Sequence, residues 1–366
     1  MKHTFGQAIT VTIFGESHGP EIGAVLDGIA PGIRIDEGYI RACLDARRPS
    51  GTLSTSRREA DEFRIVSGVF EGYTTGGALT LVIPNADTRS ADYRAMAHLP
   101  RPGHADYTAQ CKYHGYQDYR GGGHFSGRIT AALVAVGAIL RDALRTKGIH
   151  IATHIASLAG IRDDALTEDG MAALATAAFP TVSEALGERM QAAAARARAE
   201  GDSVGGTLET LITGVPAGVG EPFFDSMESV LAHMLFSIPA VKGVAFGDGF
   251  DLASMRGSEA NDPFALRDGR IVTTTNHNGG IGGGITNGMP LRITCAVKPT
   301  PSIFREQQTV DLSSMQESTL RIEGRHDGTI VHRARAVVDA ACAIVIADML
   351  TVRYGTDYLF CGEDKA

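Results

Sequence analysis

The chain has 366 residues, enough for two domains or for one large domain with a single extended core. Its formal charge is −8, from 34 basic and 42 acidic residues, which argues against nonspecific binding of nucleic acid because such binding needs a basic surface. The apolar runs near 131–140 and 340–347 are too short to span a bilayer. The five cysteines form no CxxC pair and the N-terminus carries no cleavable signal pattern, so we expect a cytoplasmic protein in a reducing compartment.

The elements predicted along the chain occur as three pairs. The first pair is a strand, a glycine turn and an amphipathic helix, the second is a glycine turn with an alternating strand, and the third is a long helix that is apolar on nearly all faces. The paired segments are 25–47 and 211–234, 74–83 and 285–294, and 126–148 and 333–355. This internal similarity indicates two related halves, roughly 1–150 and 205–355, within one domain spanning 1–366.

Helices that are apolar all round must be buried on most faces. The simplest architecture therefore packs the 126–148 and 333–355 helices together between two sheets, with a pseudo-twofold relation between the halves. The helix expected over 182–203 is different, because its Glu and Arg residues give it a solvated face. We expect it at the surface or at a subunit contact.

The 44 glycines gather in short loops such as FGESHG, EGYTTGG, YRGGGHF and NHNGGIGGGITNG. Such loops can line a ligand site with backbone, or they can be tight turns of a sheet-rich fold, and the sequence leaves both open. In RGGGHFSGRITAAL the glycines precede a helix expected to begin near Ser126. A helix N-terminus offers free N–H groups to an anion, and glycines let a ring or phosphate lie against the main chain.

Three glycine-framed loops carry residues suited to handling protons. They are GESHG with Glu16, Ser17 and His18, RPGHADYT with Arg101, His104 and Asp106, and EGRHDG with Arg325, His326 and Asp327. A loop histidine titrates near neutral pH and is a natural proton donor, although each one alone could equally satisfy a local carbonyl. The three loops together favour a catalytic site.

Arginine is the second recurring residue type in these loops. Arg binds phosphate and carboxylate through two donors in one plane, so several arginines suit a small substrate with several anionic groups. The residues in question are Arg47, Arg48, Arg57, Arg58, Arg101, Arg120, Arg128 and Arg325. For Arg57 and Arg58 we expect surface pairing with Glu59 and Asp61 instead. No metal site is predicted, because the chain has no HExxH, CxxC or HxH pattern.

Nine motifs, in order from residue 5 to about 350, resemble the chorismate synthase family. They are FGESHG, SGVFEGYTTGGAL, RPGHADYT, DYRGGG, AVKGVAFGDGF, GSEAND, NGGIGGGITNG, KPTPSI and GRHDG. The resemblance implies an α+β sandwich, with buried central helices between two antiparallel sheets, assembled as a homotetramer. It also implies 1,4-elimination of phosphate from 5-enolpyruvylshikimate 3-phosphate to give chorismate, the last step of the shikimate pathway to aromatic amino acids, with reduced FMN.

The resemblance also implies roles for individual residues. Arg48, Arg101, Arg128 and Arg325 would bind the substrate anions, and His104 would assist phosphate loss as a general acid. His18 would protonate or hydrogen-bond the flavin, Asp327 would lie near its N5 atom, and Ser17 and Ser126 would support proton relay. The predicted cofactor-binding residues are His124, Phe125, Ser126, Pro239, Ala240, Gly283, Lys298, Pro299, Thr300, Pro301, Ser302 and Arg325.

The chain departs from the family pattern near these residues. His124 stands where the family has Arg, Ile129 stands where it has Glu, and the loop RRPSGTLSTSRRE is about one residue shorter and lacks a basic residue. Because His124 carries a charge only when protonated, we predict that flavin or substrate binds better at acidic pH.

Other functions remain open from the sequence. A divergent paralogue could bind flavin or an anion without turnover, and a metal-dependent hydrolase would rest only on the number of His and carboxylate residues. Reduced flavin could come from intrinsic NADPH oxidation or from an external reductase. The chain has no dinucleotide fingerprint, which favours the external reductase.

Overall fold

The computed structural model describes residues 2–48, 61–85, 97–175, 177–322 and 327–362. Two antiparallel five-stranded sheets form its framework. The first has the order β1 (Thr4–Phe5), β2 (Thr10–Gly15), β3 (Glu21–Asp27), β7 (Leu79–Pro84), β4 (Arg64–Ser67). The second has the order β11 (Val241–Phe246), β16 (Leu291–Val297), β10 (Gly206–Thr213), β8 (His150–Leu158), β9 (Ile161–Arg162). The strands predicted at the start of 25–47 and of 211–234 correspond to β3 and β10, and those predicted within 74–83 and 285–294 correspond to β7 and β16.

The described residues also form four small two-stranded hairpins. They are β5 (Val69–Phe70) with β6 (Tyr73–Thr74), β12 (Phe264–Arg267) with β13 (Arg270–Thr273), β14 (Ile281–Gly282) with β15 (Ile285–Thr286), and β17 (Glu306–Asp311) with β18 (Gln316–Arg321). The helices are α1 (Glu37–Arg47), α3 (Asp106–Tyr113), α4 (Thr130–Thr146), α5 (Met171–Leu174), α6 (Glu184–Ala199), α7 (Met227–Phe236), α8 (Gly257–Ala260) and α9 (Val331–Tyr354). Mixed helices and antiparallel sheets confirm the predicted α+β composition.

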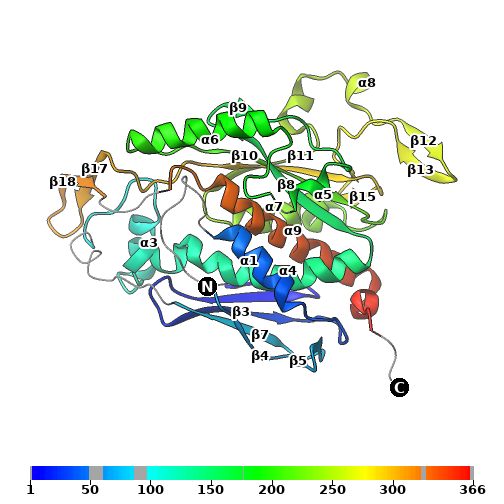
Figure 1. The fold of residues 1–366 in the computed structure, drawn as a ribbon, viewed down its shortest axis with the longest axis horizontal. Coiled ribbons are helices and arrows are strands. Elements are labelled where there is room, and N and C mark those ends of the chain that lie inside the picture. The colour runs from blue at the N-terminus through cyan, green and yellow to red at the C-terminus, as the bar shows by residue number, and fades with distance from the viewer. Residues whose placement is uncertain (1, 49–60, 86–96, 176, 323–326, 363–366) are drawn as a thin grey trace.

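The long helices α4 and α9 pack against each other at the centre of the molecule (Figure 1). In Figure 1 they lie with α1 and α7 between the two sheets. Close contact is possible because Gly137 has no side chain: a Cβ there would lie 2.5 Å from the Cβ of Ala340. Most of α9 is buried, as predicted from its apolar faces, and no helix in the described residues is long and apolar enough to cross a membrane.

The N-terminal strands are attached to this helical core by one carboxylate. Asp348 of α9 accepts hydrogen bonds from the backbone N–H groups of Gln7, Ala8 and Ile9 at 2.8–2.9 Å. Burial of Asp348 raises its pKa, and the three N–H donors only partly counter that effect. The segment entering β2 therefore has a fixed position, and β2 leads directly into the GESHG loop.

The start of the predicted 126–148 helix differs from the expectation. The run of three glycines and the two residues after it form irregular 3-10 turns, and regular α-helix begins only at Thr130. Ser126 has an extended backbone, and its Oγ accepts a bond from the N–H of Arg128 at 3.3 Å. The extended conformation of Ser126 separates the glycine run from the helix, and the 3-10 turn Gly127–Ile129 that Ser126 caps leads directly into α4.

Candidate active site

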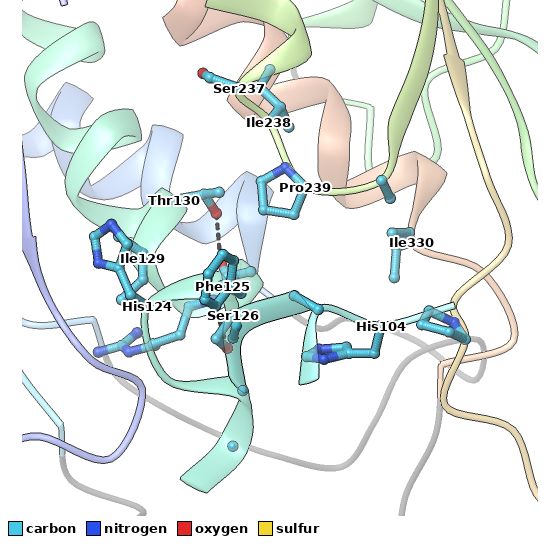
Figure 2. A pocket seen from close by; sticks show the side chains of 18 of the residues that line it. His104, His124, Phe125, Ser126, Ile129, Thr130, Ser237, Ile238, Pro239 and Ile330 are labelled. Carbon is cyan, nitrogen blue, oxygen red and sulfur yellow. Dashed lines mark hydrogen bonds between the residues drawn. The ribbon is translucent and has the colours of Figure 1, made fainter. Parts of the chain in front are cut away.

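A cavity of about 1270 Å³ opens at the end of the helical core (Figure 2). Fifteen of the predicted site residues line it: His18, Arg48, Arg101, His104, His124, Phe125, Ser126, Arg128, Pro239, Ala240, Lys298, Thr300, Pro301, Ser302 and Asp327. Ser17 and Pro299 are not in its wall, and Gly283 lies in the turn between β14 and β15. Arg325 lies outside the described residues, as do Arg57, Arg58 and Glu59. Segments from both ends of the chain therefore meet at one cavity.

The run of three glycines packs against both candidate histidines. A Cβ on Gly121 would lie 2.2 Å from Cε1 of His18, and a Cβ on Gly122 would lie 3.1 Å from Cε1 of His104. A Cβ on Gly123 would lie 2.0 Å from the carbonyl oxygen of Asp118. Gly121 thus leaves room for the ring of His18, Gly122 leaves room for the ring of His104, and Gly123 lets the chain pass close to Asp118.

His18 is buried, and two other segments hold the GESHG loop that carries it. The N–H of Ser17 donates to the carbonyl of Gly123 at 3.1 Å, which attaches the loop to the glycine run. The side-chain amide of Asn85 donates to the carbonyls of Glu16 and Gly19 at 3.0 and 2.8 Å. The Oγ of Ser17 is buried and has no hydrogen-bond partner among the described residues. It lies next to Gly121, where an added Cβ would be 2.9 Å away.

His104 belongs to a compact group with Arg101 and Asp106. Its Nδ1 lies 2.6 Å from Oδ1 of Asp106, and Arg101 donates to both oxygens of that carboxylate, through Nε at 2.7 Å and Nη2 at 2.8 Å. The backbone N–H of Arg101 adds a fourth contact at 3.0 Å. Burial opposes ionisation of Asp106, but the hydrogen bonds from Arg101 and His104 outweigh it and hold its pKa well below the usual range.

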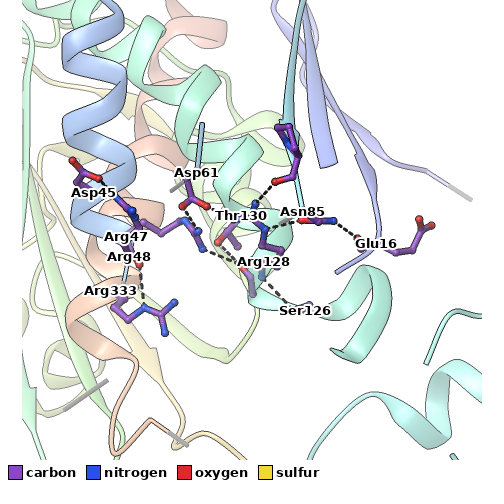
Figure 3. Close-up of polar contacts among 12 residues, drawn as sticks. Glu16, Asp45, Arg47, Arg48, Asp61, Asn85, Ser126, Arg128, Thr130 and Arg333 are labelled. Atoms are coloured by element: carbon purple, nitrogen blue, oxygen red, sulfur yellow. Dashed lines mark hydrogen bonds and ion pairs between the residues drawn. The ribbon is translucent and has the colours of Figure 1, made fainter. Parts of the chain in front are cut away.

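A buried carboxylate, Asp61, lies between two arginines (Figure 3). Arg47 donates to it at 2.6 Å and Arg128 forms a second ion pair with it. Arg128 also donates to Oδ1 of Asn85 at 2.9 Å and to the carbonyl of Pro84 at 3.1 Å. The expectation that Asp61 pairs at the surface with Arg57 or Arg58 is therefore wrong, because it is fully buried between Arg47 and Arg128.

The Arg47 contact was not predicted from the sequence, although a signal for it was present. Arg47 follows Ile40 and Leu44 at helical spacing, and all three lie on the buried face of α1. Arg128, predicted to bind a substrate anion, contacts Asp61, Asn85 and Pro84 in this structure. Its contact with a substrate anion stays a prediction.

Arg333 and Asp327 form a further ion pair beside the cavity. Arg333, at the start of α9, donates to Oδ2 of Asp327 at 2.9 Å and to the carbonyl of Arg47 at 3.0 Å. Arg48 forms an ion pair with Asp45 one turn earlier in α1 (Figure 3). Arg333 of α9 thus contributes to holding Asp327 at the cavity.

The predicted cofactor loops are joined to the His104 loop. Lys298 donates its ammonium to the carbonyl of Gly103 at 2.5 Å and its backbone N–H to the carbonyl of Ala240 at 2.9 Å. Ala240 has a φ of +75°, a left-handed conformation that is costly for a residue with a Cβ. Such strain is common at ligand sites, where the surroundings hold the backbone in place.

His124 and Phe125, the two residues that follow the glycine run, each pack against another ring. The Nδ1 of His124 lies 3.0 Å from the carbonyl of Gly15, and the ring of His3 meets it edge to face at 4.8 Å. Phe125 packs against Tyr113 and is about one-third exposed toward the cavity. Figure 2 shows His104, Ser126 and Pro239 arranged around the same space.

The lining residues fit a flavin nucleotide. Pockets for one small ligand usually measure about 300–1,000 Å³, so this cavity has room for a cofactor beside a substrate. Phe125, Pro239 and Ala240 offer apolar surface to a flat ring, while Lys298, Thr300 and Ser302 offer an ammonium and two hydroxyls to a phosphate. Within the described part of the chain, no group of three His, Cys, Asp or Glu side chains is placed to hold a metal ion.

Comparisons with known proteins agree on one family. The family model described as chorismate synthase matches residues 9–351. Chorismate synthase from Thermococcus gammatolerans is 47% identical over 348 residues, which covers 95% of this chain and 97% of that protein. The enzyme of that name from Aeropyrum pernix is 45% identical, covering 96% and 93%. A crystal structure of a chorismate synthase superposes with a TM-score of 0.76 at 27% identity, covering 97% of this chain and 95% of that one.

Proposed function

The chain belongs to the chorismate synthase family, and we propose from this that it eliminates phosphate from 5-enolpyruvylshikimate 3-phosphate to give chorismate, using reduced FMN. One observation supports the proposal most strongly. His18 and His104, 86 positions apart in sequence, pack against adjacent glycines, Gly121 and Gly122, at one cavity. A protein that only bound flavin or an anion would not need two such proton-handling groups.

The elimination breaks a C–O bond to phosphate and a C–H bond, and the electrons of the C–H bond form the new double-bond system. Reduced FMN, held by the lining residues named above, would supply electron density and basicity for this reaction. In this proposal His104 protonates the departing phosphate, and Asp327 and His18, which also line the cavity, hold or pass on a proton. Ser126 lies in the cavity wall, while Ser17 lies behind it, in contact range of the glycine run.

Charged side chains on the wall are mostly paired before any ligand binds. Arg47 and Arg128 pair with Asp61, Arg101 pairs with Asp106, and Arg333 pairs with Asp327. Pairing fixes the orientation of each guanidinium, so these groups need little reorganisation when an anionic substrate enters. The predicted anion contacts of Arg48, Arg101, Arg128 and Arg325 belong to this proposal.

The decisive experiment is an anaerobic assay with reduced FMN and 5-enolpyruvylshikimate 3-phosphate, following chorismate by its absorbance. Chorismate formation supports the proposal. His104→Ala should abolish turnover while much of the FMN binding remains. If the wild-type protein binds FMN and forms no chorismate, the chain is the non-catalytic flavin-binding paralogue instead.

We also propose that the two halves form an internal repeat with a pseudo-twofold axis between the sheets. In strand order, β1-β2-β3-β7-β4 corresponds to β9-β8-β10-β16-β11, and α1 and α4 correspond to α7 and α9. Two buried threonines support the match in detail. Thr74 donates to the carbonyl of Ala30 and accepts from the N–H of Ile33, and Thr286 does the same with Pro216 and Val219.

A homotetramer and a cytoplasmic location complete the proposal. The β12–β13 hairpin carries strongly exposed Phe264, Leu266 and Ile271, which suits contact with another subunit. Analytical ultracentrifugation would measure the assembly, and a monomer at micromolar concentration would contradict it. We further propose that an external reductase supplies reduced FMN, which oxidation of NADPH by the purified protein alone would contradict.

A further inference from the structure

The contacts of Asp106 decide which nitrogen of His104 carries a proton. A carboxylate oxygen only accepts hydrogen bonds, so an Nδ1 to Oδ1 distance of 2.6 Å requires a proton on Nδ1. The Nη2 of Arg101 lies 3.0 Å from the same nitrogen and donates one of its two N–H groups to Oδ1 of Asp106. An unprotonated Nδ1 would nevertheless place its lone pair against those of Oδ1 at 2.6 Å, which is repulsive. The Cε1–Nε2 edge of the ring then lies over Gly122, at the wall of the cavity.

The carboxylate can do this only while it stays ionised. Four donors surround its two oxygens, three from Arg101 and one from His104. Asp106 also begins α3, where the free N–H groups of the first turn favour a negative charge. The carboxylate is therefore held in one orientation, and it compensates the positive charge of Arg101 that would otherwise oppose protonation of His104.

In the part of the chain that the structure describes, few charged groups lie on the elements next to His104. The ammonium of Lys298 is bound to the carbonyl of Gly103, directly before His104. The ion pair of Arg120 with Asp118 directly precedes the glycine run, and His18 packs against Gly121 of that run. Among the described residues, Asp106 is the carboxylate that contacts the His104 ring.

We propose that Asp106 is a positioning residue that keeps a proton on Nδ1 of His104, directs Nε2 to the cavity and stabilises the imidazolium that donates a proton to the leaving group. Arg101 serves the same arrangement by orienting Asp106, and this is a different role from the direct anion contact predicted from the sequence. The proposal rests on the proposed function, since it assigns a positioning role to a neighbour of the general acid. It accounts for why His, Asp and Arg lie within six residues of each other in RPGHAD.

The chain offers a matched control in a second group of the same composition. His277 places its Nδ1 2.5 Å from Oδ2 of Asp248, and Arg292 forms an ion pair with the other oxygen. None of these three residues lines the cavity. Asp248→Asn therefore removes an equivalent carboxylate without touching the proposed site.

The first measurement uses ¹⁵N-histidine-labelled protein without cofactor, with His104 assigned by comparison with His104→Gln. The neutral His104 ring should carry its proton on Nδ1 in the wild type and mainly on Nε2 in Asp106→Asn. A wild-type ring with its proton on Nε2 overturns the proposal, whatever the variant does. This measurement does not depend on turnover, so it separates failure of the positioning role from failure of the proposed function.

The second measurement is turnover. Asp106→Asn should lower kcat by about 10²–10⁴-fold, with a smaller change in KM, and activity should begin to fall at a lower pH than in the wild type. Asp106→Glu should recover part of the loss, and Asp248→Asn should leave kcat and the pH profile unchanged. An Asp106→Asn enzyme that loses activity with an unchanged pH profile, or an Asp248→Asn enzyme that shifts equally, contradicts the positioning role.

Discussion

Substitution of Gly121 by Ala should affect catalysis far more than stability alone would explain. The new Cβ would lie 2.2 Å from Cε1 and 2.3 Å from Nδ1 of His18, whereas ordinary contact begins near 3.4 Å. The ring must therefore retreat by about 1.2 Å. A displacement of about 1 Å at a reacting group typically costs about 100-fold in rate, and we expect a loss of at least that size.

Stability should also decrease, through two separable effects. Gly121 has a φ of +58°, which costs an L-residue about 1–2 kcal/mol, and overpacking against His18 adds about 1–3 kcal/mol. Gly160→Ala is the control, because Gly160 has a φ of +80° with no atom near its Cβ position. Urea unfolding measures both variants, and the anaerobic chorismate assay measures turnover. If Gly121→Ala retains the kcat of Gly160→Ala, the glycine run does not position His18 and the reasoning is refuted.

Four further predictions concern burial, packing and charge. Asp61→Asn should destabilise the fold by about 3–5 kcal/mol, because it leaves two buried guanidinium groups with a neutral partner. Burial raises the pKa of Asp61 but the two arginines lower it more, so the wild type should lose the stabilisation from the Asp61 carboxylate as pH falls below about 4. The unfolding free energy of Asp61→Asn should not show this decrease in acid titrations. Burial, aided by the charge of Arg333, lowers the pKa of His332 to about 4, so only the unfolded state binds a proton at this residue between pH 6.5 and pH 4. The free energy of unfolding should therefore fall by on the order of 3 kcal/mol over that interval, and His332→Gln should remove this pH dependence. Gly137→Val should lower the melting temperature by several degrees by separating α4 from α9, whereas an unchanged melting temperature would show that the helices can yield. FMN should bind more tightly at pH 6 than at pH 8 if the charge of His124 contributes, and equal affinities at the two pH values would reject this.

The elements of this fold could be predicted from the sequence because they depend on local pattern. The apolar faces of α9 and the alternation in β7 and β16 are set by neighbouring residues. The range predicted for α9 therefore agrees within two residues, while β7 and β16 overlap the second part of the segments predicted for them. Regular α-helix begins at Thr130, four residues after Ser126, since sequence pattern does not distinguish an initial 3-10 turn, here Gly127–Ile129, from the α-helix that follows it. Local pattern thus predicts the existence of an element better than its boundary.

The contacts of the site depend on residues far apart in sequence, and this limited the prediction. That a GGG run excludes a side chain was clear from composition, but not that His18 occupies the space at Gly121 and His104 the space at Gly122. Asp61 shows the same limit more sharply. Its sequence neighbours suggest a surface charge, while its partners Arg47 and Arg128 come from two different helical segments.

The pairing of charges changes how the arginines of the cavity should be interpreted. Counting Arg residues suggests a strongly positive site, yet each of four guanidinium groups in or beside the cavity already has a carboxylate partner: Arg47, Arg101, Arg128 and Arg333. A buried pair is costly to break, because removing one partner leaves the other uncompensated. These arginines therefore act first as rigid walls that fix Asp61, Asp106 and Asp327. For Arg101 we propose that its effect on the reaction runs through Asp106, which contacts His104, in addition to the predicted contact of Arg101 with a substrate anion.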